Sequence, residues 1–204
     1  FQGIRQYSGP VYGDGNSYNL PTKDLYDAFG PNDNVRRDAS VLDLDAFIAA
    51  QSSTEITYAV GGGGHTGYYN NKYIKRIGEF GLPDNDLTSP VNYRVIRYAD
   101  VLLMAAEAHS EIGSAGPALR YVNEVRTRAG VPALSGSGEQ LTNDIYNERR
   151  LELCGEGFRF FDLVRTGEAA NKIEGFIDGK HNLFPIPQVE IVLSGSQWSQ
   201  NSGY

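Results

Sequence analysis

Apolar residues recur at helical spacing along the second half of the chain, from Tyr93 onward. The first such stripe consists of Ile96, Ala99, Leu102, Leu103 and Ala106. A period of three to four residues places these side chains on one face of a helix. The pattern therefore predicts an amphipathic helix that ends near Gly113, because glycine commonly follows the last helical turn.

Three more helices are expected after this one. The second contains Ala118, Leu119, Val122 and Val125 and ends at Ala129 and Gly130. The third begins between residues 139 and 141 and ends at Gly155, and the fourth covers about residues 158–170. Helices in short succession pack as antiparallel hairpins, and the first pair has the spacing of one tetratricopeptide repeat, a weak signal on its own. We predict a mainly α fold of tetratricopeptide-like hairpins with long irregular loops.

The first part of the chain has a different composition. Residues 1–92 are rich in Gly, Asn, Asp, Pro and Tyr and show little sustained periodicity, which predicts loops punctuated by short helices. Helices are expected in residues 21–30, with Thr22 as the cap, and in residues 40–50, with Ser40 as the candidate cap, although the alternation Val-Leu-Asp-Leu in the latter fits a strand equally well. We expect residues 1–92 to be a candidate ligand surface and 93–204 a helical region, together one domain of a longer protein.

Charge and cysteine content exclude several classes of protein. A net charge of −7 and a pI near 5.0 argue against a nucleic-acid partner, which requires clustered Lys and Arg. One cysteine excludes an internal disulfide framework, and the three histidines have no metal-ligand spacing. No P-loop, dinucleotide fingerprint or nucleophile elbow is present. We therefore expect no metal, no cofactor and no catalytic residue.

One segment mixes charges with core-like residues, "NERRLELCGEGFRFFDLVRTG" at 147–167. Glu148 and Glu152 share a helix face, as a glycosidase pair would, but the arginines nearby would keep both ionised, whereas such a pair needs one raised pKa. A structural network is the preferred interpretation, because charges embedded in a core are normally paired. Its expected members are Glu148, Arg149 and Glu152, paired across a turn with Arg159, Asp162 and Arg165.

Five segments follow one another in the order and spacing of a known family. They are "IRYADVLLMAAEAHSEIG", "ALRYVNEVRTRAGV", "NERRLELCGEGFRFFDLVRTG", "LFPIPQVEI" and the terminal "QNSGY". Together they resemble the C-terminal half of SusD/RagB proteins. The resemblance implies a SusD-like α/α superhelix and a lipoprotein on the extracellular face of the Bacteroidetes outer membrane. It further implies capture of glycans for a SusC-like TonB-dependent transporter, with membrane attachment only through an N-terminal lipid anchor that this chain lacks.

Aromatic and amide side chains around a glycine run are the candidate glycan contacts. Flat aromatic rings cover the C–H faces of sugars, and amides reach their hydroxyls. In the segment "EITYAVGGGGHTGYYNNKYI" the candidates are Tyr58, His65, Tyr68, Tyr69, Asn70, Asn71 and Tyr73. The alternative is that Tyr73 and one of Tyr68 and Tyr69 pack beneath the long helix. A second candidate set is Tyr7, Tyr12 and Tyr18, and Trp198 is expected in a structural tail.

A different class of function remains open from the residues alone. Tetratricopeptide-like hairpins also bind peptides, so the chain would then be a protein-interaction module for the transporter or a peptide, with glycan recognition elsewhere. The distinguishing feature is whether the loop tyrosines are exposed together on one face. A glycoside hydrolase ranks third, because the motif search finds no catalytic constellation.

Overall fold

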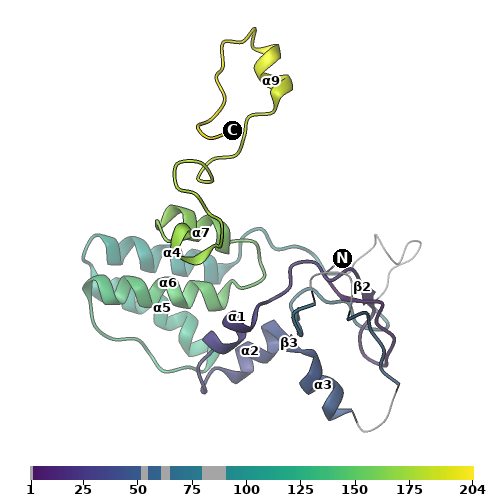
Figure 1. Ribbon diagram of the computed structural model, residues 1–204. Coiled ribbons are helices and arrows are strands. Elements are labelled where there is room, and N and C mark those ends of the chain that lie inside the picture. The colour runs from purple at the N-terminus through teal and green to yellow at the C-terminus, as the bar shows by residue number, and fades with distance from the viewer. Residues whose placement is uncertain (1, 52–54, 61–64, 80–90) are drawn as a thin grey trace. The chain divides into compact units, whose positions relative to one another are not determined.

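The computed structural model describes residues 2–51, 55–60, 65–79 and 91–204. These residues group into two compact units, Phe1–Glu156 and Gly157–Tyr204. Figure 1 shows the helices and strands of both units. The division expected at residue 92, between a loop-rich segment and a helical region, stays a prediction. In the described part of the chain, no helix has the length and apolar character needed to cross a membrane.

Three helices form the helical layer of the first unit (Figure 1): α4 (Tyr98–Glu111), α5 (Ala115–Ala129) and α6 (Gly138–Glu152). Helix α4 packs against both α5 and α6. The buried faces carry most of the expected apolar stripes, with Leu102, Leu103 and Ala106 on α4 and Ala118, Val122 and Val125 on α5. Ile96, the first member of the expected stripe, is exposed, because α4 begins only at Tyr98. The mainly helical fold predicted from the hydrophobic period is confirmed.

The ends of these helices follow from local sequence. Gly113 and Gly130 adopt positive φ after α4 and α5, and left-handed backbone at this position is inexpensive only for glycine. The chain beyond α5 is held by Asn123, whose side chain donates to the carbonyl of Leu134 at 3.0 Å and accepts from its N–H at 2.7 Å. Both turns therefore have the boundaries that the sequence predicts.

Short elements make up the loop-rich part of the first unit: α1 (Lys23–Ala28), α2 (Asn34–Ser40), β3 (Val41–Asp43) and α3 (Leu44–Ala50). Thr22 caps α1 by accepting from the N–H of Leu25, as expected. The ambiguous segment at 40–50 contains both a strand and a helix. The cap of that helix is Asp43, which accepts from the N–H of Ala46, rather than Ser40.

Two small sheets connect these elements. Strand β1 (Ile4–Arg5) pairs in parallel with β2 (Asp14–Gly15), and β3 pairs antiparallel with β4 (Tyr68–Asn70). Leu42 lies opposite Tyr69, and both belong to one apolar cluster with Ile4 and Leu44. Val41 belongs to the other cluster, against which Tyr68 packs. The period of two along a strand thus sends neighbouring tyrosines into different cores.

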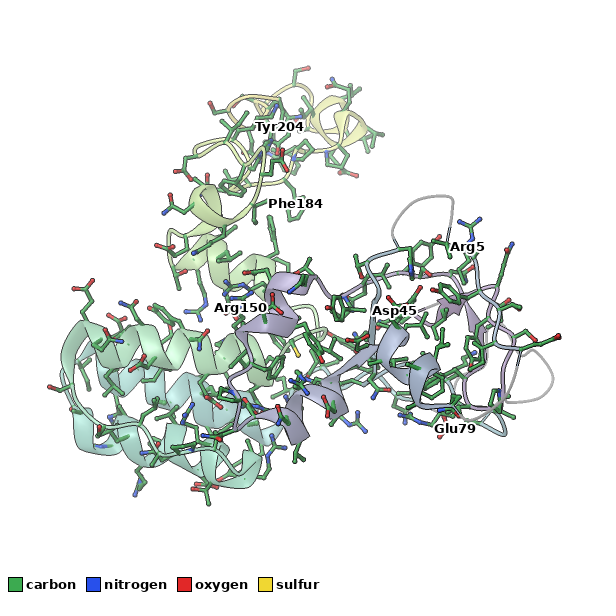
Figure 2. All side chains as sticks on the ribbon, turned by 60° about the horizontal axis from the view of Figure 1, so that its bottom comes forward. Arg5, Asp45, Glu79, Arg150, Phe184 and Tyr204 are labelled. Atoms are coloured by element: carbon green, nitrogen blue, oxygen red, sulfur yellow. The ribbon has the colours of Figure 1, made fainter. Side chains whose placement is uncertain are left out.

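The second unit contains three short helices: α7 (Arg159–Arg165), α8 (Ala169–Lys172) and α9 (Gln188–Leu193). The single helix expected over residues 158–170 is broken, because Gly167 adopts a φ of +74° after α7. The C-terminal tail bonds back to an earlier segment of the same unit. Gln200 bonds to both backbone groups of Ile186 at 2.7 Å, and the Tyr204 hydroxyl donates to the carbonyl of Leu183. Figure 2 labels Tyr204 and Phe184 in this unit.

Candidate functional site

A buried network of ion pairs is centred on α6. Glu148 and Glu152 lie one turn apart on its buried face, and the side chain of Glu148 is 0 % exposed. Glu148 accepts from Arg36 at 2.5 Å and from Arg126 at 2.5 Å. Arg36 also donates to Asp33, its neighbour at the start of α2. Because each of these carboxylates and guanidinium groups has a partner of opposite charge, charge-assisted hydrogen bonds offset the desolvation cost of their burial.

Glu152 and Glu156 form the second half of the network. Arg97 joins them, donating from Nη1 to Glu152 at 2.7 Å and from Nε to Glu156 at 2.7 Å. Glu152 also accepts from Arg128 at 2.5 Å, and Glu156 accepts from Lys72 at 2.6 Å. Arginine suits the central position because its planar fork reaches two carboxylates at once. Segments from five parts of the sequence are therefore joined through charges.

These pairs keep both carboxylates ionised. Burial by itself would raise the pKa of Glu152, but the hydrogen bond and positive charge of Arg97, with the charge of Arg128, outweigh it and lower the pKa below its ordinary value of 4.5. The pKa of Glu156 is lowered for the same reason, with burial opposed by Arg97 and Lys72. Neither group has the raised pKa that a general acid needs near neutral pH.

We expect stability to fall in acid through these two residues. Because the folded pKa of Glu152 and Glu156 lies below the unfolded value, their contribution is complete above about pH 5 and is lost as pH falls through the folded pKa values. Urea unfolding at a series of pH values should show this loss. The loss should be smaller in Glu152→Gln and unchanged in the exposed control Glu124→Gln; equal slopes in all three proteins would contradict the assignment.

The charged segment at 147–167 is thus partly placed. Glu148, Arg149 and Glu152 are buried, and Arg149 donates to Asp100 on α4 at 2.5 Å. In the second unit Asp162 pairs with Arg165 at 2.9 Å. The pairing expected from the first three residues to Arg159, Asp162 and Arg165 stays a prediction. The sequence did not predict the other members of the network, which are Asp33, Arg36, Lys72, Arg97, Asp100, Arg126, Arg128 and Glu156. No local pattern in the sequence marks these residues as partners in the network of Glu148 and Glu152.

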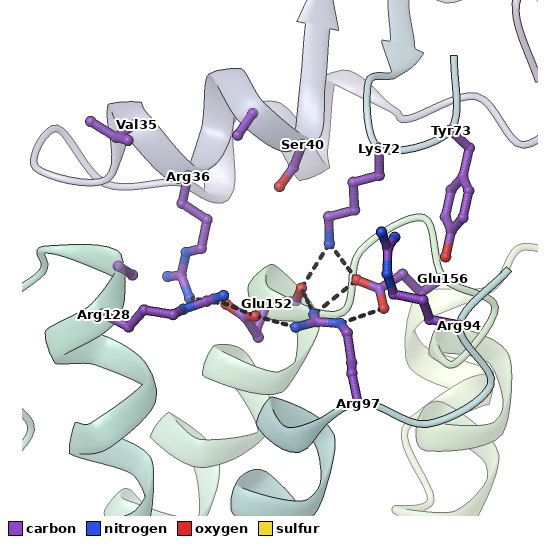
Figure 3. A pocket seen from close by; sticks show the side chains of 12 residues that line it. Val35, Arg36, Ser40, Lys72, Tyr73, Arg94, Arg97, Arg128, Glu152 and Glu156 are labelled. Carbon is purple, nitrogen blue, oxygen red and sulfur yellow. Dashed lines mark hydrogen bonds and ion pairs between the residues drawn. The ribbon is translucent and has the colours of Figure 1, made fainter. Parts of the chain in front are cut away.

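A cavity of about 530 Å³ lies beside the network. Figure 3 shows α2, the Lys72–Tyr73 turn, the segment before α4 and the end of α5 around it. Five cationic side chains line this cavity, against two carboxylates: Arg36, Lys72, Arg94, Arg97 and Arg128, with Glu152 and Glu156. We call it the arginine pocket. Its lining also contains Tyr73, one of the residues that sequence analysis selected.

The structure places two of the predicted ligand contacts inside the protein. The ring of Tyr69 is 0 % exposed, and its hydroxyl bonds to Nδ1 of His65 at 2.8 Å. The amide of Asn70 is also buried and donates to the carbonyl of Gly155 and to Gln2, both at 2.9 Å. Neither side chain presents a surface to a ligand, and both stabilise the loop-rich segment.

The remaining candidates are half-buried and do not form one patch. Tyr58 lies against His65 with ring centroids 5.2 Å apart. The other two tyrosines stack elsewhere: Tyr68 on Tyr26 at 4.7 Å, and Tyr73 on Tyr93 at 6.1 Å. Asn71 donates to the backbone of Asp38 and accepts from Arg76. Glycan contact by these residues stays a prediction. Of the second set, Tyr7 and Tyr12 are buried in the core, whereas Tyr18 is exposed, as is Trp198 in the second unit.

Metal chemistry has no support in this geometry. Among the described residues, no group of three or more His, Cys, Asp or Glu side chains is arranged to hold a metal ion. Cys154 is buried beside Leu151 and Phe29, and burial raises the pKa of its thiol. The site therefore offers hydrogen-bond donors, positive charge and aromatic rings, which are groups suited to binding a polar molecule.

Comparison with known proteins shows the family of the chain. The family model described as the SusD family matches residues 51–204. The chain belongs to the SusD family. SusD-like protein P2 of Formosa agariphila is 30 % identical, in a match that covers 99 % of this chain and 43 % of the relative. SusD-like protein P25 of the same organism is 36 % identical over 66 % of this chain and 29 % of the relative.

Solved structures of the SusD family share the fold. A laminarin-binding SusD-like protein is similar with a TM-score of 0.80 and 38 % identity over 100 % of this chain and 43 % of that protein. Surface glycan-binding protein A from Bacteroides thetaiotaomicron, solved with laminarihexaose, has a TM-score of 0.73 and 31 % identity over 93 % of this chain and 42 % of that protein. The chain thus spans less than half the length of these relatives.

Proposed function

We propose that this chain is part of a non-catalytic protein that binds an oligosaccharide or polysaccharide. The observation that carries the proposal is the structural match over the whole chain to a SusD-like protein that binds laminarin. The ion-pair network adds support, because its carboxylates are held ionised by arginines and so lack the acid of a glycosidase pair. Laminarin, a neutral glucan, is accordingly the first ligand to test.

We further propose the family role for the whole protein. In that role a lipid-anchored protein on the extracellular face of the outer membrane captures a glycan and passes it to a SusC-like TonB-dependent transporter. Contact with the glycan is proposed for the half-buried rings of Tyr58 and His65, which lie beside each other in the loop-rich segment. Rings in such a position can stack on a sugar while the surrounding core holds them in place.

Affinity electrophoresis in gels containing laminarin tests the proposal. Wild type should be retarded, and the double variant Tyr58→Ala with His65→Ala should lose most of this retardation while its circular dichroism spectrum stays helical. Tyr121→Ala is the matched control, because Tyr121 is also a half-buried tyrosine stacked on a histidine, but on α5. Equal retardation of all three proteins would refute the placement of the site.

The same experiment addresses the alternative function. Helix α4 carries exposed apolar side chains, among them Tyr98, Val101 and Met104, and such a face is typical of protein–protein contact. If wild type binds neither laminarin nor any other glycan in an array, the evidence favours an interaction module for the transporter or a peptide.

A further inference from the structure

The arginine pocket carries more positive charge than its ion pairs consume. The pocket and the network beside it contain six cationic side chains, Arg36, Lys72, Arg94, Arg97, Arg126 and Arg128. The carboxylates that face them are four, Asp33, Glu148, Glu152 and Glu156. This leaves a formal local charge of +2 in a chain whose net charge is −7. A concave site with one sign of charge concentrates the field and attracts ions of the opposite sign.

The cations differ in how many donors they have left. Arg36 and Arg97 each direct all three guanidinium nitrogens at carboxylates or carbonyls of the network. Arg128 uses one amino group on Glu152, and its side chain is 61 % exposed. Lys72 donates to Glu156 and to the carbonyl of Glu152. Free donors therefore remain on Arg128, which lies at the pocket lining.

Arg94 differs from the other five cations in its contacts. Its guanidinium makes no hydrogen bond or ion pair with the part of the chain that the structure describes, and the residue is exposed. Figure 3 shows its side chain next to Tyr73 and Glu156 on the pocket wall. An arginine held at a cavity without a carboxylate partner keeps all five N–H donors for a planar or tetrahedral anion.

The carboxylates of the pocket do not cancel this attraction. Glu152 accepts from Arg36, Arg97 and Arg128, and Glu156 accepts from Arg97 and Lys72. The negative charge of these two carboxylates is thus balanced within the network by Arg36, Lys72, Arg97 and Arg128. The excess formal charge is therefore positive, and it lies on the part of the pocket wall that carries Arg94 and Arg128.

An aromatic wall adjoins the free donors. Tyr73 lines the pocket, and its ring stacks on Tyr93 with centroids 6.1 Å apart. Tyr93 is fixed in turn, because its hydroxyl donates to the carbonyl of Glu156 at 2.8 Å. Sugar rings pack on such faces while their substituents reach polar groups nearby. The cavity volume of about 530 Å³ falls in the range of small-ligand sites.

We propose that the arginine pocket binds an acidic saccharide, with its carboxylate or sulfate group on Arg94 and Arg128 and a sugar ring against Tyr73. This inference rests on the proposed glycan-binding function and specifies a charged ligand class for a site separate from the rings of Tyr58 and His65. Carboxylate and sulfate both fit the arginine fork through paired hydrogen bonds. A neutral sugar lacks the group that these donors recognise.

Three monosaccharides that differ at one carbon test the proposal: glucose, glucuronate and glucose 6-sulfate. Each is titrated into the chain at low ionic strength while backbone NMR signals are followed. Saturable shifts around the arginine pocket are expected for glucuronate, for glucose 6-sulfate or for both, and the pair identifies which anion is preferred. Glucose should give none there. Added salt should weaken the binding, because exposed charges are screened.

Arg94→Gln is the decisive variant. Because no described carboxylate pairs with Arg94, its removal leaves no buried charge without a partner. Binding of the acidic sugar should weaken about tenfold or more, as expected for loss of a charge-assisted hydrogen bond. Arg120→Gln is the matched control, because it removes the same charge from an exposed arginine of α5 that does not line the pocket. Its affinity should stay within about twofold of wild type.

Two results would overturn the proposal. One is that neither glucuronate nor glucose 6-sulfate binds saturably. The other is that Arg94→Gln and Arg120→Gln weaken the binding of the acidic sugar equally. Laminarin binding, measured on the same samples, separates this failure from failure of the proposed function. Laminarin bound without any acidic sugar would reject the pocket assignment alone, whereas wild type that binds neither laminarin nor any other glycan, acidic or neutral, would reject the proposed function as well.

Discussion

Replacement of Glu148 by glutamine is expected to lower the free energy of unfolding by about 3–5 kcal/mol. The variant keeps the shape of the side chain but leaves Arg36 and Arg126 without their shared carboxylate. Arg36 keeps Asp33 and Glu152 as partners, but it is buried, so water cannot replace the lost bond to Glu148 without opening the contact between α2 and α6. Urea unfolding followed by circular dichroism measures this change, because the helices of the first unit give most of the signal.

Glu124→Gln is the control for this experiment. Glu124 also loses a negative charge on substitution, but it is exposed on α5, where such a change alters stability by about 0.5 kcal/mol or less. The comparison separates the effect of the network from that of net charge. If both variants unfold at the same urea concentration, the ion pairs do not hold the elements together.

Gly155→Ala is the second change with a large expected effect. Gly155 has a φ of +73°, which costs an alanine about 1–2 kcal/mol. A Cβ atom there would also lie 2.4 Å from Nδ2 of Asn70. That amide cannot move away freely, because it is buried and donates to the carbonyl of Gly155 and to Gln2. Crowding should therefore add about 1–3 kcal/mol to the destabilisation.

Gly130→Ala isolates the backbone contribution. Gly130 has the same φ of +73°, but no heavy atom lies within 4 Å of the position that a Cβ would take. Only the backbone cost of about 1–2 kcal/mol is expected there. Thermal or urea unfolding of both variants gives the difference. Equal destabilisation would mean that the side chain of Asn70 adjusts, and that it does not hold the turn after α6 against the loop-rich segment.

The two kinds of charged residue around α6 have different expected roles. Side chains whose donors are consumed, such as Arg36 and Arg97, connect elements that are far apart in the sequence, so their loss should affect folding. Side chains with donors left over, such as Arg94 and Arg128, face the cavity and are available to a ligand. Stability and binding measurements on the same variants therefore distinguish scaffold from site.

The sequence alone determined the features that depend on neighbouring residues. The stripes on α4 and α5 from Leu102 onward, the glycines that end these helices and the Thr22 cap of α1 are all set within one or two turns, and each has the predicted position. Membership of the SusD family was visible as well, because it rests on motifs in linear order. That Glu148 and Glu152 are paired where they are buried could likewise be expected, since charges embedded among apolar residues are normally paired.

Only the tertiary structure decided which residues meet. Arg36 reaches Glu148 across 112 positions and Lys72 reaches Glu156 across 84, and no local pattern specifies such partners. The pairing of β3 with β4 sends Tyr68 and Tyr69 into different clusters, which separates residues that look equivalent in the sequence. The arginine pocket arises in the same way: Arg97 and Arg128 find their carboxylate partner on α6, whereas Arg94 has no carboxylate partner among the described residues.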